Sequence, residues 1–505
     1  MKVLQVKSLF PFVLLFLASA RPGVADVPFS LRMEGNRISL RAEGVPLRDV
    51  LEAFAAYGVT VHAQSNLQGL VHAQVHQEDL NETLKKILGD YNHITTWTEY
   101  PYANGTVSVL SSIRVFNPER VGDPMLPLPA ADMRVQTLPD GTRVVADEVL
   151  IGMKPGTSPA AFRAMLARVG GQVVDVDPRL GIYRVRLPAN SNLPDVLERL
   201  QGMGGLAVAE PNLVIDMPPP HRTGAGGVPA APRLSLPPLP PGAPALAILD
   251  SGLDPAWLAP EHLRGSRDIT QPERGISDPN GHGTQMALIG AGLITPAGAT
   301  ERTDAVPIVA IRGFDAQGRS TSFGLLESMN YAHEQGAGVM SMSWGSETSS
   351  DILAAAFDRA ARAGMLFLAA AGNEGHEVPM YPAAYPGVIA VGAMTAEGTP
   401  WAQSNRGDHV AFLSYGTATF PVGHDGPPGT YAGTSIATPW VAAAITAYQA
   451  QHPQAQSADV LTALLSALSP HAEGTGDGYG AGIFDAAARD RFMQTPPKSN
   501  GGVAD

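Results

Sequence analysis

The 505-residue sequence contains no cysteine. This absence excludes disulfide bonds, which hold many small secreted domains together, and metal sites built from thiolates. A chain of this length does not need such staples, because it is long enough to bury large apolar cores and 44% of its residues are hydrophobic. We therefore expect globular domains that are stabilised by packing alone.

Charged residues are scarce, at 16% of the sequence, and positive ones are the scarcer. The 34 lysines and arginines stand against 47 acidic residues, which gives a formal net charge of −13. An acidic protein is repelled by phosphate backbones and by anionic lipid headgroups. The excess of acidic residues therefore disfavours nucleic acid and anionic membrane surfaces as partners.

Long hydrophobic runs are also lacking. Beyond residue 25 no segment approaches the roughly 18 uninterrupted apolar residues that a membrane helix requires. Residues 1–25 combine two early lysines, an apolar stretch at 9–17 that is too short to span a bilayer, and small residues that suit cleavage. This pattern predicts an export signal, and hence a periplasmic or secreted protein with no membrane span after the signal is removed.

The most informative motif lies at residues 433–439, with the sequence GTSIATP. Ser435 follows a glycine that lets a substrate carbonyl approach closely, and it opens an apolar run, residues 436–448, that predicts a buried helix. We expect Pro439 in the first turn of this helix, where its missing N–H costs nothing. The Ser435 hydroxyl then sits at the positive end of a helix. Because a serine hydroxyl becomes a nucleophile only when a base removes its proton, the motif predicts a nearby histidine.

Three further polar residues stand at predicted strand ends and helix starts. His282 lies in a GHGT motif before a small, apolar run, and histidine is the natural base near neutral pH. Asp250 ends the apolar run 245–249, and Asn373 follows the apolar run 365–369. The carboxyl ends of buried parallel strands are where open α/β sheets place their sites. There a carboxylate can orient the histidine, and an amide can donate to an oxyanion.

Each of these short motifs, taken alone, is more often a turn or a helix cap than a catalytic site. Four of them in order favour the catalytic interpretation. Asp254 is the rival of Asp250, but it precedes a proline and is expected to be a solvated turn residue. The rival bases lack flanking glycines of this kind, and we expect them at the surface or in loops: His333, His376, His409, His424 and His452.

Residues 244–488 resemble the subtilisin-like serine proteases, or subtilases, in the order Asp250, His282, Asn373 and Ser435. The resemblance implies an α/β fold: a three-layer catalytic domain with a mostly parallel sheet, preceded here by two small α+β domains. It also implies an endopeptidase that forms an acyl-enzyme on Ser435, with His282 as base, Asp250 as orienting carboxylate and Asn373 in the oxyanion hole. This chemistry needs no metal or other cofactor.

The resemblance also assigns residues to substrate binding. These residues pair with the substrate backbone or line the primary pocket: Ser343, Trp344, Gly345, Ala370, Ala371 and Gly372. Their small, mostly neutral side chains predict an apolar or broad preference, although Glu374 near the base of the pocket could admit a basic side chain. Structural calcium is common in the family, but no loop of alternating aspartates assigns a site here. His72 and His76 alone are too few ligands for zinc, so no metal site is predicted.

Two stretches depart from the family pattern. Many subtilases have the sequence HVAG after the Gly-Thr of the histidine motif, where this chain has QMAL at residues 285–288. A histidine that often follows the proline of the serine motif is replaced by Trp440. Neither change touches a proton-transfer group, so we expect them to alter helix packing near the site, and through it substrate preference.

Two units precede the catalytic domain. Residues 145–216 show a strand, a capped helix, an alternating strand and a second helix, and their closing run LAVAEPN resembles the end of subtilase propeptides. In the family these propeptides act as intramolecular chaperone and inhibitor. Residues 27–116 follow a β-α-β-β-α order and resemble the short N-terminal domain of secretins and TonB-dependent receptors, which serves contacts with envelope proteins. A generic small α+β domain is the alternative for each unit.

The linker at residues 217–244 contains ten of the 44 prolines and is expected to be an extended, semi-rigid spacer. An exposed chain between inhibitor and enzyme is a natural place for self-cleavage, so we predict an autoprocessed zymogen that is cut there. The predicted organisation is a signal peptide at 1–25, small domains at 27–116 and 145–216, the linker at 217–244, the peptidase domain at 245–488 and a disordered tail at 489–505.

Three classes of function fit this organisation. The favoured one is an exported serine endopeptidase that acts on polypeptides and is inhibited by its own propeptide. The second is an envelope docking or scaffold protein that relies on the N-terminal module. The third is a peptide ligase or cyclase that uses the same acyl-enzyme. An intact set of four catalytic residues disfavours the scaffold, because nothing structural requires all of them together.

Overall fold

The computed structural model describes residues 29–34, 36–55, 57–64, 67–102, 105–120, 122–128, 133–224, 242–272, 274–299 and 305–497. The predicted signal peptide at 1–25, part of the linker (225–241) and the end of the tail (498–505) lie outside these residues. The tail was predicted to be disordered from residue 489, and its first residues correct that prediction: they belong to helix α10 (Ala486–Gln494), which buries Phe492. The chain divides into two compact units, one of Met1–Thr98 with Ser108–Ala131, and one of Glu99–Val107 with Asp132–Asp505. None of the described helices is long and apolar enough to cross a membrane.

The first unit contains two small sheets, with strand orders β1-β2-β4 and β5-β6-β3-β7. Helix α1 buries four apolar residues at helical spacing against this unit's core, among them Val50 and Phe54. The predicted β-α-β-β-α order is present as β2-α1-β3-β4-α2, with further strands before and after it. The elements are β1 (Ser30–Glu34), β2 (Arg37–Pro46), α1 (Leu47–Ala55), β3 (Thr60–Gln64), β4 (Leu70–Asp79), α2 (Leu80–Leu88), β5 (Asn92–Tyr102), β6 (Gly105–Phe116), η1 (Pro118–Arg120) and β7 (Met125–Pro127).

The second unit begins with an antiparallel sheet of order β10-β11-β9-β12, to which β8 adds by pairing with β9. Local chemistry sets the ends of helix α3: Ser158 caps its first turn by accepting from the N–H of Ala161, and Gly170 ends it in the left-handed conformation. The elements are β8 (Val135–Thr137), β9 (Arg143–Met153), α3 (Pro159–Val169), β10 (Gln172–Asp177), β11 (Ile182–Arg186), α4 (Leu193–Gln201) and β12 (Leu206–Asp216).

An eight-stranded sheet forms the centre of the remainder, in the order β15-β16-β14-β18-β19-β20-β21-β24. Every neighbouring pair in it is parallel, which confirms the predicted mostly parallel sheet. Its central strands are continuous apolar runs because helices cover both faces. The strands are β14 (Ala245–Asp250), β15 (Leu263–Asp268), β16 (Ile308–Arg312), β18 (Ala337–Met342), β19 (Leu366–Ala370), β20 (Val388–Met394), β21 (Val410–Tyr415) and β24 (Ile483–Phe484).

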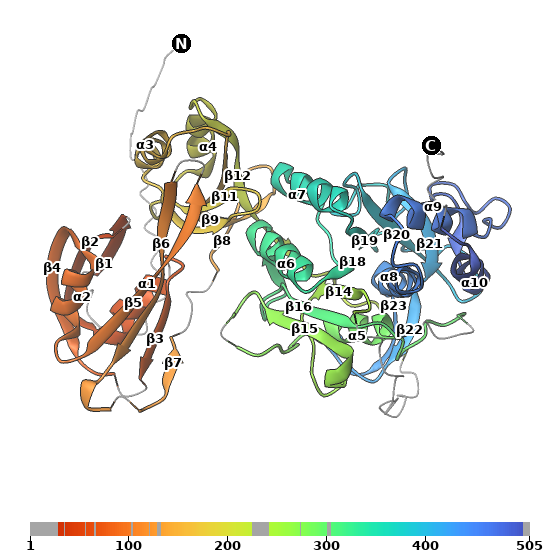
Figure 1. Cartoon of the computed structure of the whole chain (residues 1–505), viewed down its shortest axis with the longest axis horizontal. Coiled ribbons are helices and arrows are strands. Elements are labelled where there is room, and N and C mark those ends of the chain that lie inside the picture. Colours follow the sequence, from red (N-terminus) through yellow and green to blue (C-terminus); the bar gives the residue numbers. More distant parts are fainter. Residues whose placement is uncertain are drawn as a thin grey trace, which may run out of the picture. The chain divides into compact units, whose positions relative to one another are not determined.

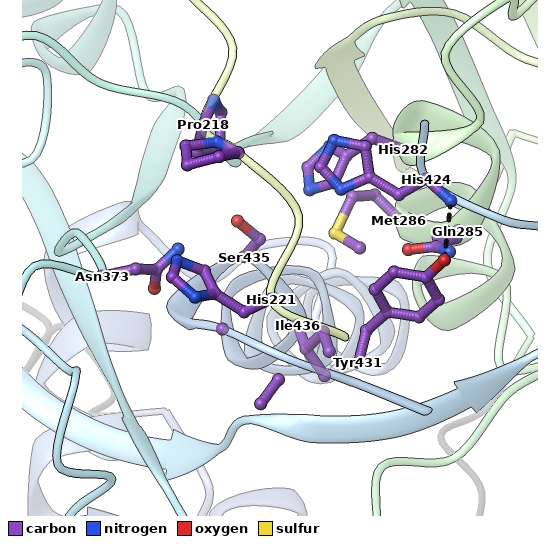
Figure 2. A pocket seen from close by; sticks show the side chains of 13 residues that line it. Pro218, His221, His282, Gln285, Met286, Asn373, His424, Tyr431, Ser435 and Ile436 are labelled. Atoms are coloured by element: carbon purple, nitrogen blue, oxygen red, sulfur yellow. Dashed lines mark hydrogen bonds between the residues drawn. The ribbon is translucent and has the colours of Figure 1, made fainter. Parts of the chain in front are cut away.

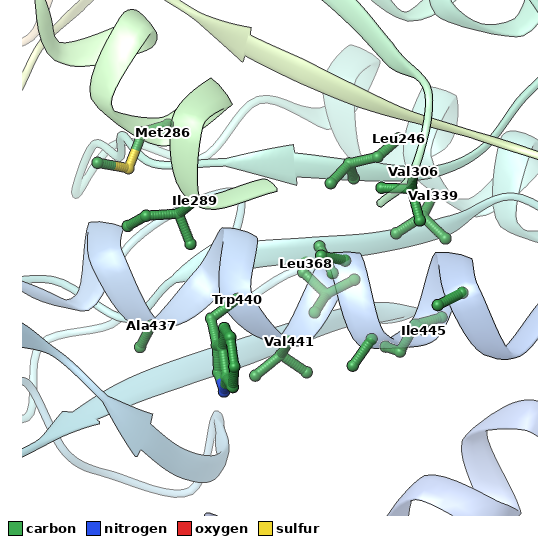
Figure 3. Packing of buried hydrophobic residues seen from close by; sticks show 14 of the residues in the cluster. Leu246, Met286, Ile289, Val306, Val339, Leu368, Ala437, Trp440, Val441 and Ile445 are labelled. Carbon is green, nitrogen blue, oxygen red and sulfur yellow. The ribbon is translucent and has the colours of Figure 1, made fainter. Parts of the chain in front are cut away.

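Helices α5 and α8 cover one face of this sheet and α6 and α7 the other, which makes three layers (Figure 1). A core of buried hydrophobic residues lies at α8, and it includes Trp440 and Val441 with Ile289 of α5 and Leu368 of β19 (Figure 3). The remaining elements are η2 (Pro260–His262), α5 (His282–Gly290), β17 (Arg319–Thr321), α6 (Ser322–Glu334), α7 (Asp351–Arg362), α8 (Thr434–Gln451), α9 (Ser457–Ala467) and α10 (Ala486–Gln494), with β13 (Arg222–Gly224), β22 (Thr417–Phe420) and β23 (Gly429–Ala432) in a small separate sheet.

The antiparallel sheet and the peptidase-like part share a strand edge. Strand β17, which precedes α6, pairs antiparallel with the end of β12, so that it extends the sheet of residues 135–216. The small sheet of β13, β22 and β23 joins the two parts a second time, because β13 follows β12 in the chain while β23 leads directly into α8. These two pairings bring the start of the proline-rich segment close to the start of α8.

Candidate active site

Element ends position the four predicted catalytic residues. Asp250 is the last residue of β14, and Asn373 follows shortly after β19, the strand two places along the sheet. His282 is the first residue of α5, and Ser435 is the second residue of α8. All four are at least nine-tenths buried. Parallel strands that end at the same edge, with two helices that start there, bring residues from nearly two hundred positions of sequence into one place.

Asp250 and His282 form a direct hydrogen bond. Nδ1 of His282 donates to Oδ1 of Asp250 at 2.7 Å, and Oδ1 also accepts from the backbone N–H of Ser251 at 2.7 Å. Burial disfavours a positive imidazole, but Asp250, with Asp278 and Asp425 farther away, outweighs burial and raises the pKa of His282 above its ordinary value. The bond fixes Nδ1 as the protonated nitrogen of the neutral ring, so that Nε2 is left as the acceptor.

A second aspartate, which the sequence reasoning did not single out, braces this pair. Asp278 accepts from the hydroxyl of Ser251 at 2.8 Å and from the backbone N–H of Thr284 at 2.7 Å. The Ser251 hydroxyl in turn accepts from the backbone of Gly283 at 2.8 Å. A Cβ at Gly283 would lie 2.3 Å from the carbonyl oxygen of Gly252, so glycine is required where the aspartate and histidine motifs touch. In the sequence, the SDPN run at residues 277–280, just before the GHGT motif, could have indicated that Asp278 lies near the site.

The position of Pro439 differs from the sequence-based expectation. Helix α8 begins at Thr434, which places Pro439 in its second turn, where the missing N–H removes a hydrogen bond to the carbonyl of Ser435. That carbonyl is satisfied instead by the hydroxyl of Ser343, which donates to it at 3.1 Å. The Ser435 hydroxyl donates to the carbonyl of Ser343 at 3.3 Å. The proline thus frees a backbone acceptor that anchors the serine to the loop after β18.

Asn373 is held with its amide nitrogen free to face the serine. Its Oδ1 accepts from both the backbone N–H and the hydroxyl of Thr434, each at 2.9 Å. A Cβ at Gly433 would come within 3.4 Å of Nδ2, so the absence of a side chain there keeps the space in front of the amide open. Glu374 accepts from the backbone N–H of Asn373 and from Asn405. Its carboxylate therefore braces this loop, a role that the sequence reasoning did not assign to it.

We expect replacement of Asn373 by alanine to lower kcat by about 10²–10³ with little change in KM, because the amide acts only on a developing oxyanion. Thr434→Val should cause a smaller loss, since the backbone N–H still holds Oδ1. Steady-state kinetics on a peptide substrate measures both. A rise in KM at unchanged kcat would instead assign Asn373 to ground-state substrate binding.

His424 was expected at the surface or in a loop. It lies in a loop but is only 4% exposed, and its ring packs on His282 with ring centroids 4.6 Å apart (Figure 2). The loop is tied to α5 and to the turn before it, since Gln285 donates to the carbonyl of Val422 at 2.8 Å and Asn280 to the carboxylate of Asp425 at 2.7 Å. Burial, reinforced by the neighbouring His282 and His221, lowers the pKa of His424 to about 2. His424 is therefore a neutral wall beside the proposed base.

One pocket contains His282, Asn373 and Ser435, and it is closed by the chain's own Pro218 and His221 (Figure 2). The six residues predicted to bind substrate are not among those that line it. Trp344 is buried and donates from Nε1 to the carbonyl of Leu249 at 2.9 Å, and Ser343 contacts Ser435 as described above. In the described part of the chain, no group of three or more His, Asp or Glu side chains is placed to hold a metal ion.

Comparisons with known proteins agree with this geometry. The sequence model of the Subtilase family matches residues 243–482, and that of the Fervidolysin N-terminal prodomain matches residues 130–212. The crystal structure of fervidolysin from Fervidobacterium pennivorans, described as a keratinolytic enzyme related to subtilisin, superposes with a TM-score of 0.57 at 21% identity. The match covers 72% of this chain and 63% of that one, and it shows a shared fold.

Two subtilisins with related sequences identify the family. Subtilisin E from Bacillus subtilis (strain 168) is 30% identical over 249 residues, 48% of this chain, and the match spans 64% of its own length. Subtilisin from Bacillus pumilus is 30% identical over 249 residues, again 48% of this chain but 89% of the relative. Identity at this level over nearly the whole of a subtilisin shows that the chain belongs to the subtilase family of serine-type endopeptidases.

Proposed function

We propose that the protein is an exported serine endopeptidase, made as a zymogen, that hydrolyses peptide bonds in polypeptides through an acyl-enzyme on Ser435. The observation that carries the proposal is the 2.7 Å hydrogen bond between Asp250 and His282, in a site that also contains Ser435 and Asn373. A carboxylate, an imidazole, a hydroxyl and an oxyanion donor are the groups that acyl transfer from a peptide requires. None of these steps needs a cofactor.

The mechanism starts with a change of hydrogen-bond partner. The Ser435 hydroxyl, which donates to the carbonyl of Ser343, must turn toward Nε2 of His282. His282 takes the hydroxyl proton as the serine oxygen attacks the scissile carbonyl, and Asp250 supports the imidazolium that forms. Nδ2 of Asn373 and the backbone N–H of Ser435 stabilise the oxyanion. His282 then protonates the leaving amine, and water releases the acyl group by the same steps in reverse.

We propose that residues 145–216 are the inhibitory propeptide. Two of their side chains cap helices of the peptidase part: Glu210 accepts from the hydroxyl of Ser350 and from backbone N–H groups that open α7, and Asn212 accepts from the N–H of Phe323 in α6 at 3.1 Å. Helix N-termini carry unpaired donors and a partial positive charge, so these contacts stabilise the docked state. Such contacts support the chaperone and inhibitor role that the resemblance implies.

Propeptide docking should weaken as the pH rises through neutrality. Glu327 of α6 is partly buried at this interface; burial and Asp175 and Asp177 of the propeptide raise its pKa to about 7, against the opposing effect of Arg184 and Arg267. Close by, Asn330 donates to Asp177 at 2.6 Å, Arg179 pairs with Glu334, and Arg184 lies over the ring of Phe323. Because the docked pKa lies above the ordinary carboxyl value, docking takes up a proton and is tightest at acidic pH.

Because docking of the propeptide is coupled to protonation of Glu327, we expect the propeptide to inhibit about tenfold more weakly at pH 8 than at pH 6. The measurement is casein hydrolysis by the full chain at both pH values, expressed as the ratio of wild type to Glu327→Gln, which cancels the titration of the catalytic histidine. The wild-type activity should gain about tenfold over the variant between pH 6 and pH 8. A ratio that stays constant with pH contradicts the assignment of Glu327.

The organisation predicted from the sequence completes the proposal. We assign residues 1–25 to an export signal and residues 245–488 to the peptidase domain, with Ser343–Gly345 and Ala370–Gly372 as substrate-binding segments. For residues 27–116, the resemblance to the short N-terminal domain of secretins and TonB-dependent receptors supports a docking role toward an envelope protein. We leave the periplasm and the medium as alternative destinations, and a structural calcium ion remains compatible with the family but is assigned no residues.

Mass spectrometry of the products from casein and from a peptide library tests the proposed reaction. Each cleavage event should add one water across a peptide bond, and the array of cut sites should show an apolar or broad preference. Products that have lost water by joining two peptides would favour a ligase or cyclase instead. Intact substrates throughout would favour the docking or scaffold function.

A further inference from the structure

We infer that residues 217–224 lie in the substrate groove as an extended segment that resists cleavage at its three proline bonds, so that the site stays closed until this segment is displaced; the inference rests on the proposed peptidase function. We name this segment the proline strap. It was expected to be a free spacer at the start of the linker, and the structure corrects that expectation. The strap is paired to the peptidase part at both of its ends and crosses the catalytic serine between them.

The first end of the proline strap continues the pairing of β12 with β17. Ile215 lies opposite Ser320 and Asp216 opposite Arg319 in an antiparallel register. The next residue, Met217, donates from its backbone N–H to the carbonyl of Gly318 at 2.8 Å. Addition of an extended segment to an exposed strand edge is how many proteins bind peptides, because backbone hydrogen bonds hold the segment whatever its side chains are.

The far end pairs with the strand that leads into the catalytic serine. The backbone N–H of Ala432 donates to the carbonyl of His221 at 2.9 Å, and β13 runs antiparallel to β23 with Arg222 opposite Tyr431. Side chains add to this pairing, since Arg222 donates to the carbonyl of Pro428 at 3.2 Å. Because β23 ends at Ala432, three residues before Ser435, the strap is held on both sides of the nucleophile.

Between the two pairings, the strap passes over the reacting groups. Pro218, Pro219 and His221 line the same pocket as His282 and Ser435. Figure 2 shows the strap as an extended segment that passes Ser435, with Pro218 above the serine and His221 below it in this view. A polypeptide that lies in an extended form across the nucleophile occupies the place of a substrate.

The sequence of the strap explains why it would not be cut. Residues 218–220 are three consecutive prolines, so each of the three bonds that join residues 217 to 220 has a proline nitrogen as its leaving group. A proline ring carries a methylene in place of the N–H, and that methylene crowds the backbone of the residue before it. Attack by Ser435 must build a tetrahedral centre beside this methylene, and His282 must deliver its proton to a ring nitrogen. Both steps are hindered.

The same prolines make the strap a good inhibitor. Consecutive prolines are confined to an extended helix with little freedom to lose, so ordering them in the groove costs less entropy than ordering a flexible peptide. Propeptide docking, through Glu210 and Asn212, raises the local concentration of the strap further. Self-processing within the strap is therefore disfavoured, and the mature chain should not begin at Pro218, Pro219 or Pro220.

The test is the full chain with Pro218, Pro219 and Pro220 all replaced by alanine, compared with wild type and with a matched control in which Pro237, Pro238 and Pro240 are replaced. Intact-mass analysis and N-terminal sequencing after incubation identify the cut sites. We expect cuts at the three bonds that join residues 217 to 220 in the strap variant only. The same strap variant with Ser435→Ala should remain uncut, which shows that the enzyme itself makes the cut.

The outcomes separate the strap from the proposed function. Wild-type chains that begin at residues 218–220 would overturn the inference, and so would a strap variant that hydrolyses casein but stays uncut between 217 and 220. If no variant hydrolyses casein, the peptidase function fails, and the strap inference falls with it. Casein hydrolysis also reports that the strap variant has folded, so that an unfolded protein is not mistaken for a resistant one.

Discussion

Replacement of Ser435 by alanine is expected to lower casein hydrolysis by about 10⁴–10⁶-fold. Ser435 is 5% exposed at the start of α8, and its hydroxyl is the only atom of the side chain that can bond to a substrate carbonyl. What remains without it is the catalysis supplied by binding and by the oxyanion donors, on the order of 10³–10⁴ over water. Fluorescence release from labelled casein measures the loss, and size analysis shows whether the chain still processes itself.

Ser466→Ala is a suitable control, because Ser466 is exposed on α9 and lies outside the proposed site. The control should retain full activity and normal processing. Equal turnover by wild type and by Ser435→Ala would end the assignment of Ser435 as nucleophile. A loss of activity accompanied by a loss of cooperative thermal unfolding would reflect misfolding, and circular dichroism of the purified variant excludes it.

Replacement of Asp250 by asparagine is expected to lower kcat by about 10⁴-fold while the fold is retained. The carboxylate fixes the tautomer of His282 through the 2.7 Å bond to Nδ1, whereas an amide that donated there would favour the wrong tautomer. The pH profile should change as well. Asp250 is the main influence that raises the pKa of His282 against burial, so its removal lowers that pKa.

The direction of the pH effect follows from the role of the base. His282 must be neutral to accept the serine proton, so activity is lost as the pH falls through its pKa. A lowered pKa in Asp250→Asn therefore moves the acid limb of the residual kcat/KM profile to lower pH. Asp254→Asn serves as the matched control, because the side chain of Asp254 accepts from the N–H of Ala256 in the turn that follows it and makes no hydrogen bond to His282. Equal losses in both variants would undo the assignment of Asp250.

Local sequence was sufficient to predict where the four proposed catalytic residues stand in the fold. An apolar run that ends in Asp250, a glycine-flanked His282 and the GTSIATP motif around Ser435 each specify a strand end or a helix start. Element ends depend on nearby residues: burial periodicity sets where a strand or helix runs, and glycine or a capping side chain sets where it stops. The parallel sheet followed from the same runs, since strands buried on both faces read as continuous apolar segments.

Local sequence was also misleading where the outcome depended on partners far along the chain. Pro439 lies one turn deeper in its helix than expected. The backbone carbonyl that it leaves without a helical partner is that of Ser435, and it accepts from the hydroxyl of Ser343, ninety-two positions earlier in the chain. His424 looked like an ordinary loop histidine, but the ties of its loop to α5 bury it against His282. The burial of His424 depends on the residues that pack against it, and its neighbours in the sequence do not indicate which residues these are.

The sequence by itself determined which groups could react and at which element ends they stand, because those features depend on residues a few positions apart. Only the tertiary structure decided what lies over them. From its composition, the proline-rich segment was predicted to be a spacer. Its first residues nevertheless line the pocket of His282 and Ser435, because the edges of β17 and β23 carry backbone donors and acceptors that an adjacent extended chain can pair with. Pairing between strand edges that are far apart in the sequence depends on the three-dimensional fold, so it cannot be predicted from the local sequence pattern.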